Sequence, residues 1–158
     1  MKSYRIHRDV RFSPDKSPYK LWLGSLHTRP AGSMEYFHLD KSGLMVAAGA
    51  YMMEPAQLTR FRAALLDDAA GRKLERLAKK LAASEVVLDP GGLPPLKSAP
   101  RGVAADHPRI DWLRWKGCAA MGRFNGDLLA DGPRLIEQMV GWWKTTEPLN
   151  VWLDEALG

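Results

Sequence analysis

The sequence predicts an α+β fold, in which an antiparallel, meander-like sheet from the N-terminal half packs against helices of the C-terminal half. Three observations lead to this prediction. Segments with strand-like alternation occupy the first fifty residues, short turns join them, and apolar residues at helical spacing follow Glu54. The length of 158 residues fits one domain, residues 1–158.

The N-terminal half contains four expected strands, in the ranges 4–12, 19–26, 34–40 and 44–52. In the first, apolar side chains such as Val10 and Phe12 occupy every second position, as in a half-buried strand. The third places His38 on a polar face with Tyr36 and Asp40. The fourth is apolar on both faces and is expected in the middle of the sheet. Short connections favour antiparallel pairing.

The C-terminal half is expected to be mainly helical. Pro55 suits the first turn of a helix, and a second helix is expected over residues 69–83. The segment Asp89 to Gly102 contains four prolines and three glycines, so it is expected to be a loop. The remaining expected elements are a short helix near Pro108, an edge strand over 116–124, a helix through 135–143 and another helix beginning at Pro148.

Charge and composition limit the class of protein. The net charge is +5, and Lys and Arg exceed Asp and Glu in residues 1–41, 54–80 and 97–123. This asymmetry predicts a basic surface that attracts anions. No apolar run could span a membrane, and the N-terminus lacks the apolar core of a signal peptide, so we expect no membrane association and a cytoplasmic location. A single cysteine, Cys118, excludes an internal disulfide.

The stretch RDVRFSPDKSPYK, residues 8–20, is the main candidate site. On the expected strand, Arg8 falls on the apolar face, which is costly unless the guanidinium is paired or faces a polar cleft. One interpretation is a clamp for phosphate or carboxylate. Its cations would be Arg8, Arg11, Lys16 and Lys20. The other interpretation is a structural network in which Asp9 and Asp15 pair with these cations, and arginine suits both roles equally.

A second candidate is DHPRID, residues 106–111. His107 and Asp111 are four positions apart and could share a helical face, where the carboxylate would orient the imidazole for proton transfer. Asp106 is expected to cap the helix, and capping and ion pairing are the alternative role for the whole stretch. His38 is the other histidine considered for acid–base chemistry.

Several kinds of site are not indicated. The histidines lack zinc-motif spacing, no carboxylate cluster resembles a calcium loop, and the glycine signatures of phosphate and dinucleotide loops are absent from the sequence. The sequence therefore predicts no metal site and no cofactor. Cys118, within CAAM, is expected to be a buried small side chain.

Four segments together resemble the domain-of-unknown-function 2461 family of bacterial and fungal proteins. They are RDVRFSPDKSPYK, EYFHLD, the apolar strand that ends in Met-x-Glu-Pro, and DHPRID. The likeness runs from about Tyr4 to Leu157. It implies a single α+β domain and no particular reaction. The matching positions are Arg8, Asp9, Arg11, Phe12, Asp15, Lys16, Tyr19, Lys20, His38, Asp106, His107, Pro108 and Asp111.

The resemblance also implies several dozen helical residues before the first strand, whereas this chain begins almost at that strand. We therefore expect an apolar face that a homodimer or another partner covers. This expectation supports one hypothesis for function, a regulatory or structural interaction module.

The leading hypothesis is a cytosolic domain that binds a small phosphate-bearing anion in a basic cleft, with possible acid–base catalysis. The expected ligand-binding residues are Arg8, Arg11, Asp15, Lys16, Tyr19, Lys20 and Arg109. The expected catalytic residues are His38, His107 and Asp111. A further alternative is nucleic-acid binding by a basic helix face. That face comprises Arg72, Lys73, Arg76, Lys79 and Lys80.

Overall fold

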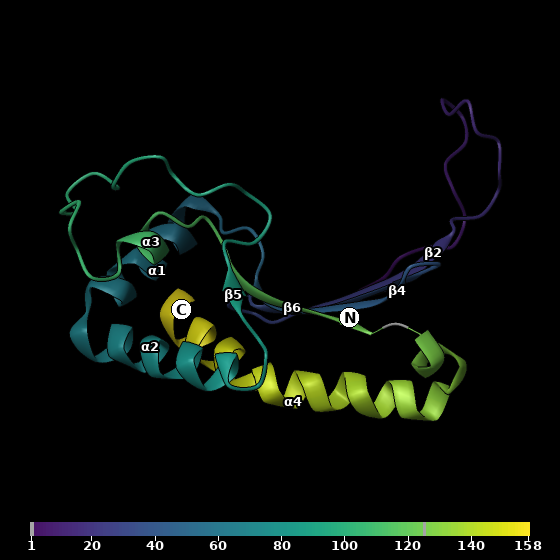
Figure 1. The fold of residues 1–158 in the computed structure, drawn as a ribbon. Coiled ribbons are helices and arrows are strands. Elements are labelled where there is room, and N and C mark those ends of the chain that lie inside the picture. Colours follow the sequence, from purple (N-terminus) through teal and green to yellow (C-terminus); the bar gives the residue numbers. More distant parts are fainter. Residues whose placement is uncertain (1, 125) are drawn as a thin grey trace.

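An antiparallel sheet forms the centre of the molecule (Figure 1). The computed structural model describes residues 2–124 and 126–158, and within them the sheet has six strands in the order β1-β2-β3-β4-β6-β5. The strands are β1 (Lys2–Ser3), β2 (Trp22–Thr28), β3 (Met34–Asp40), β4 (Gly43–Ala50), β5 (Leu88–Asp89) and β6 (Cys118–Phe124). All neighbouring pairs are antiparallel. Together with the helices that follow, this sheet confirms the predicted α+β class.

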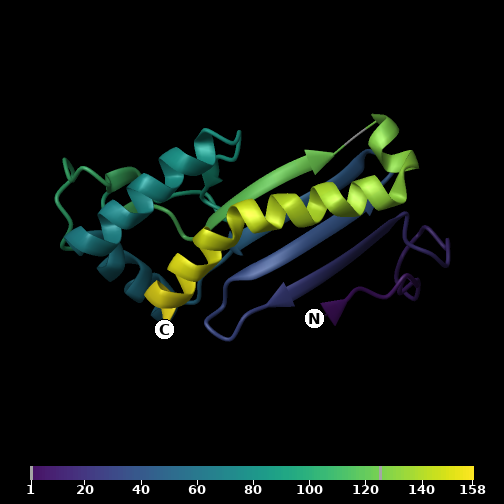
Figure 2. The same ribbon diagram turned by 90° about the horizontal axis from the view of Figure 1, so that it is seen from below.

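The helices lie on one face of the sheet and beyond one end of it (Figures 1 and 2). They are α1 (Pro55–Leu66), α2 (Asp68–Ala82), α3 (Ile110–Leu113), the 3₁₀ helix η1 (Gly126–Ala130) and α4 (Gly132–Leu157). The first part of α4 runs along the sheet, and its last turns pack between α1 and α2. There Phe61 and Trp152 meet edge to face with ring centroids 6.0 Å apart. This end of α4 therefore completes the main hydrophobic core.

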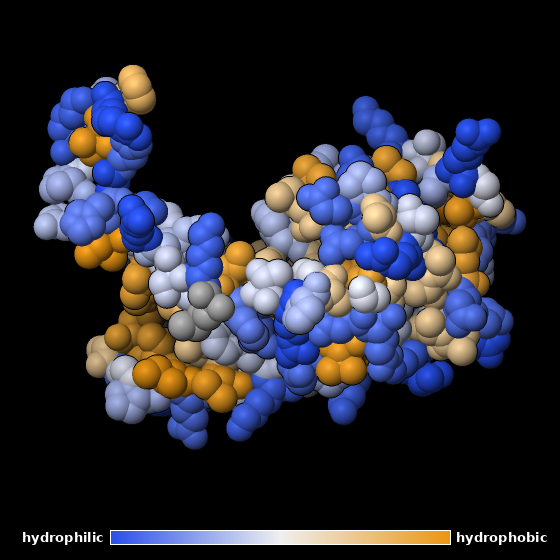
Figure 3. All heavy atoms as spheres, turned by 180° about the vertical axis from the view of Figure 1, so that it is seen from behind, coloured by the Kyte–Doolittle hydropathy of each residue, from blue (hydrophilic) through white to orange (hydrophobic). Residues whose placement is uncertain are grey.

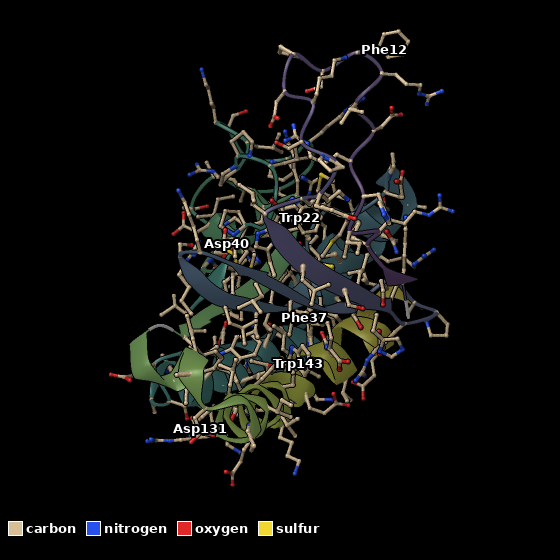
Figure 4. All side chains as sticks on the ribbon, turned by 90° about the vertical axis from the view of Figure 1, so that its right-hand side faces the viewer. Phe12, Trp22, Phe37, Asp40, Asp131 and Trp143 are labelled. Atoms are coloured by element: carbon tan, nitrogen blue, oxygen red, sulfur yellow. The ribbon has the colours of Figure 1, made fainter. Side chains whose placement is uncertain are left out.

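Strand alternation gives the sheet two different faces. Val46 and Ala48 are buried on the face that α4 covers, where the Trp143 indole donates a hydrogen bond of 3.4 Å to the Ala47 carbonyl. Figure 4 shows Phe37 on this side of the sheet, toward Trp143. In the described part of the chain no helix covers the opposite face over β2 and β3 (Figure 1). We call this opposite face the open sheet face.

The expected strand over residues 4–12 is wrong. Phe12 is 95% exposed, and among residues 2–12 only Lys2 and Ser3 belong to a strand. Alternation alone does not make a strand, because a strand also needs a neighbour for its backbone hydrogen bonds. Here the chain turns back on itself through a segment with Pro14 and Pro18, which lack the amide donors of a ladder. The other three N-terminal strands are confirmed, with ends shifted by up to three residues.

Two expectations for the C-terminal half are also wrong. The strand expected at an edge, β6, lies between β4 and β5, so it is an interior strand. The two helices expected on either side of residue 147 are one helix, α4, with Pro148 inside it. Figure 2 shows α4 changing direction in its C-terminal half, as a proline within a helix commonly causes. Among the described residues, no helix is long and apolar enough to cross a membrane.

Candidate ligand-binding site

Residues 5–21, which we call the N-terminal loop, project from the edge of the sheet (Figures 1 and 3). The loop is closed at its base by backbone hydrogen bonds. Lys20 donates to the Ile6 carbonyl at 2.8 Å, and Arg8 donates to the Pro18 carbonyl at 2.9 Å. Figure 4 shows Phe12 at the far end of the loop, away from the sheet. The loop is therefore an irregular projection rather than a strand.

Most charged groups of the N-terminal loop satisfy one another. Arg11 donates two side-chain hydrogen bonds to Asp9, at 3.0 and 2.7 Å, and Arg8 forms an ion pair with Asp15. Lys16 donates to a backbone carbonyl, that of Val10, at 2.9 Å. For these side chains, the contacts match the structural network that the sequence offered as an alternative.

The acidic partners are held in their charged form. Hydrogen bonds from Ser17, and then the bond from Arg8, lower the pKa of Asp15 to about 2. The Arg11 side chain likewise lowers the pKa of Asp9. Both carboxylates are therefore ionised at neutral pH, and the loop keeps its internal pairs.

Lys20 differs from Arg8, Arg11 and Lys16 in the kind of contact that it makes. Its ammonium lies over the Trp22 ring, 4.4 Å from the centroid, and 5.9 Å from the centroid of Tyr4. No carboxylate pairs with it among the side chains that the structure describes. Lys20 lines a hollow of about 420 Å³ with Arg8, Asp9 and Trp22. We call this the basic hollow.

An aromatic cluster continues from the basic hollow onto the open sheet face. The His38 ring stacks on Trp22, with centroids 4.9 Å apart and planes 22° from parallel. Tyr4 meets Trp22 and Tyr36 edge to face, at 5.6 and 6.3 Å. A Cβ atom on Gly24 would lie 3.3 Å from both Trp22 and the Tyr36 hydroxyl, so glycine allows the two rings to approach.

Both ring nitrogens of His38 have neighbours. Nδ1 lies 3.1 Å from the Tyr36 hydroxyl, and Nε2 lies 3.4 Å from an Asp40 oxygen. Burial, and then the nearby Tyr4, raises the pKa of Tyr36. Hydrogen bonds from Ser42 lower the pKa of Asp40, and His38 adds to this effect. At neutral pH the cluster therefore has a protonated phenol and a charged carboxylate on either side of the imidazole.

A second depression, of about 480 Å³, follows the open sheet face. Apolar and aromatic side chains form most of its lining. They include Tyr4, Leu26, Met34, Tyr36, Ala47 and Met121. Figure 3 shows the molecule hollowed between the projecting N-terminal loop and the helical part. We call this depression the sheet groove.

The structure does not bring DHPRID to the basic hollow. Figures 1 and 2 place α3 and the N-terminal loop at opposite ends of the molecule. His107 accepts a hydrogen bond from the Arg109 amide at 3.1 Å, and Asp111 lies 3.8 Å from Arg114. The short helix starts only at Ile110, so His107 and Asp111 do not share a helical face.

Arg109, expected to bind ligand, lies in the helical layer. Its side chain is 8% exposed, with Nε donating to Glu75 at 2.7 Å and Nη1 donating to the Leu65 carbonyl at 2.9 Å. Asp68 lies 3.6 Å away. These contacts give the arginine a role in joining α1 and α2 to the segment before α3.

The basic face of α2 is partly neutralised. Arg72 pairs with Asp68 at 3.2 Å, and Lys73 pairs with Glu155 at 2.6 Å. No ion pair joins Arg76, Lys79 or Lys80 to a carboxylate among the described residues. Any anion at this face would therefore meet three cations rather than five.

Two other kinds of chemistry concern the Cys118 thiol and groups of metal-binding side chains. Burial raises the pKa of the Cys118 thiol to about 12, so it stays protonated as expected of a buried side chain. Among the side chains that the structure describes, which leave out residue 1 and residues 125–127, there is no group of three or more His, Cys, Asp and Glu that could hold a metal ion.

Sequence reasoning selected Arg8, Lys20 and His38 but missed the aromatic residues between them. Trp22 was assigned only to a strand, and Tyr36 only to the face that carries His38. The signal that could have found Trp22 is its spacing of two positions from Lys20, because residues two apart on a strand share a face. Tyr4 reaches the same face through a bond from its amide to the Gly24 carbonyl, which the sequence does not predict.

Comparison of the chain with curated proteins and with solved structures finds no significant match. A family model matches residues 1–152, nearly the whole chain. Its description is "Conserved hypothetical protein (DUF2461)". On this match, and in agreement with the resemblance in its motifs, the chain belongs to the DUF2461 family.

Proposed function

We propose that this protein binds a small phosphate-bearing anion in the basic hollow. The observation that supports the proposal is the position of Lys20, whose ammonium lies over the Trp22 ring and has no carboxylate partner among the described residues. A cation–π contact holds an ammonium in place without neutralising it. The charge of Lys20 is therefore directed to the hollow and available to an external anion.

Arg8 supplies a second positive group. A guanidinium carries five N–H donors, and the Arg8 contact with Asp15 uses only one terminal nitrogen. Asp15 is itself held by the Ser17 amide, at 2.9 Å, so it keeps Arg8 in position beside the hollow. An anion bound between Lys20 and Arg8 would receive charge-assisted hydrogen bonds from two directions.

His38 fits a positioning role in this proposal. Its ring stacks on Trp22, and its nitrogens lie beside Tyr36 and Asp40, so it holds the indole on which Lys20 rests. Acid–base chemistry by His38 would need the ligand to displace one of these two neighbours. We therefore propose ligand binding as the primary function, in the cytoplasm as the sequence predicts, and assign no reaction.

Calorimetric titration with methyl phosphate tests the proposal. Lys20→Gln should weaken binding about tenfold or more, because a hydrogen bond to a charged group contributes roughly 1.5–3 kcal/mol. Lys97→Gln is the matched control, since it makes the same change at an exposed loop position whose side chain forms no hydrogen bond or ion pair with the described residues. The control should bind as tightly as the unmodified protein. Equal affinity of both variants would contradict the proposal.

A further inference from the structure

We infer that the anionic ligand is an amphiphile, whose charged group occupies the basic hollow and whose flexible apolar part lies in the sheet groove. This inference rests on the proposed function. It adds a chemical class to the ligand, because it assigns the apolar part to a separate set of side chains.

The sheet groove and the basic hollow are neighbours joined by Tyr4. Tyr4 lines the groove, and its ring lies 5.6 Å from that of Trp22, which lines the hollow. Lys2 and Lys20 both approach the Tyr4 ring, at 5.7 and 5.9 Å. Positive charge is therefore concentrated at the end of the groove that adjoins the hollow, which sets the orientation of a ligand with one anionic end.

The lining of the groove favours an aliphatic or similarly flexible body. Three methionines, Met34, Met52 and Met121, contribute to it, and methionine adapts its shape to apolar ligands. Met52 and Met121 are 58% and 48% accessible, so they present apolar surface that a ligand in the groove can cover. An alkyl chain along the groove would remove this surface from water.

A stacking nucleobase fits less well. The Trp22 ring already contacts the His38 ring and the Lys20 ammonium, and Tyr4 and Tyr36 meet edge to face. Single-stranded nucleic acid is recognised through aromatic faces on which bases stack. In this cluster the rings contact one another, so the apolar surface left for a ligand belongs mainly to aliphatic and methionine side chains.

The position of the groove favours a dispersed molecule over a membrane surface. The groove lies between the N-terminal loop and the helical part, and the loop projects away from the sheet with Phe12 at its far end (Figures 3 and 4). A flat bilayer would meet the loop before it reached the groove. A single amphiphile can enter the concave region between the loop and the helical part.

A chain-length series of alkyl phosphates tests the inference. We expect methyl, butyl and octyl phosphate, below their aggregation concentrations, to bind with affinity that rises about two- to fourfold per methylene, because each buried methylene is worth up to about 0.8 kcal/mol. Met121→Gln should remove much of this gain for octyl phosphate and leave methyl phosphate affinity unchanged. Met139→Gln, on α4, is the matched control and should retain the gain.

The results separate the two proposals. Affinity for methyl phosphate that depends on Lys20 but does not increase with chain length overturns the amphiphile and leaves the proposed function. Absence of any dependence on Lys20 overturns both. A gain with chain length that survives Met121→Gln overturns the assignment to the groove. Binding to anionic phospholipid vesicles, without binding to dispersed octyl phosphate, also overturns the inference.

Discussion

Arg109 shows how the surroundings of a residue, rather than its type, decide its role. The sequence marks it as one more cation, two positions after His107, and predicts that it binds ligand. In the structure its guanidinium is enclosed by Glu75, the Leu65 carbonyl and α2. A guanidinium is well suited to such a buried junction because its rigid donors can meet several acceptors at once.

The absence of a side chain at Gly71 leaves room for the Arg109 guanidinium to pack against α2. A Cβ at Gly71 would lie 2.4–2.6 Å from the guanidinium of Arg109, whereas a Cβ at Gly141 in α4 meets nothing within 4 Å. Gly141→Ala should therefore stabilise the protein by about 0.5–1 kcal/mol through helix propensity. Gly71→Ala should destabilise it by roughly 1 kcal/mol or more through overpacking. Urea unfolding measures both, and similar gains for the two variants would contradict this account.

The candidate site could be predicted only in part from the sequence. Arg8 and Lys20 were selected for their charge, and the structure places both at the basic hollow. What distinguishes Lys20 from Lys16 is its acceptor: Lys16 bonds a carbonyl, while Lys20 lies over aromatic rings. Alternation predicts Phe12 on the buried side of a strand, but Phe12 is exposed, because alternation along the chain does not say whether a neighbouring strand exists.

Among the elements, the N-terminal loop depends most on ion pairs and turn bonds. It buries little apolar surface, since Ile6, Phe12, Tyr19 and Leu21 are all exposed. Its order depends on the Ile6–Lys20 and Arg8–Pro18 backbone bonds and on the Asp15 contacts. Conditions that protonate Asp15 should therefore loosen the loop while the sheet and helices persist.

The pH at which Asp15 titrates is a direct test. Its pKa in the folded protein is about 2, below its ordinary value of 3.8, so the contribution of the charged carboxylate is complete above about pH 4. That contribution is lost as the pH falls through about 2. Carbon-13 NMR of the carboxyl group should give this midpoint.

Substitution at Arg8 refines the test. Arg8→Ala should raise the midpoint of Asp15 only partway, because the hydrogen bonds from Ser17 are larger causes of the lowered pKa than the arginine. A midpoint at the ordinary value in the unmodified protein would be inconsistent with the loop contacts. Full recovery of the ordinary Asp15 pKa of 3.8 in Arg8→Ala would also be inconsistent with these contacts.

Elements with many long-range partners were predictable to different degrees. β3 has its expected bounds because its alternation and flanking turns agree with its two neighbours in the sheet. The position of β6 between β4 and β5 could not be read from its sequence, because a two-residue partner such as β5 leaves almost no pattern. Pro148 was expected to start a helix, and tertiary packing of Leu149, Trp152 and Leu153 instead continues α4 through it.

At the scale of the whole molecule, charge and shape are unevenly distributed. The helical part contains the main core, and the sheet extends from it with one face covered by α4 and the other open (Figures 1 and 2). The open face is where the basic hollow and the sheet groove lie. Net positive charge and this exposed surface together favour an anionic, partly apolar ligand.

The basic face of α2 makes a separate prediction. Because Asp68 and Glu155 neutralise two of its five cations, the remaining three could contact at most three phosphates. Affinity for an oligonucleotide should then change with salt by a log–log slope no steeper than about −2.7. Fluorescence anisotropy over a salt series measures the slope. A steeper slope, reduced by substitution of Lys79 and Lys80, would favour nucleic-acid binding instead.

A nitrogen-15 NMR titration with methyl phosphate tests whether an anion binds at Lys20. We expect shifts confined to the amides of Arg8, Lys20 and Trp22 and to the Trp22 indole, and we expect these shifts to be absent in Lys20→Gln. Shifts centred on α2, or on the segment that contains His107 and Asp111, would contradict this expectation.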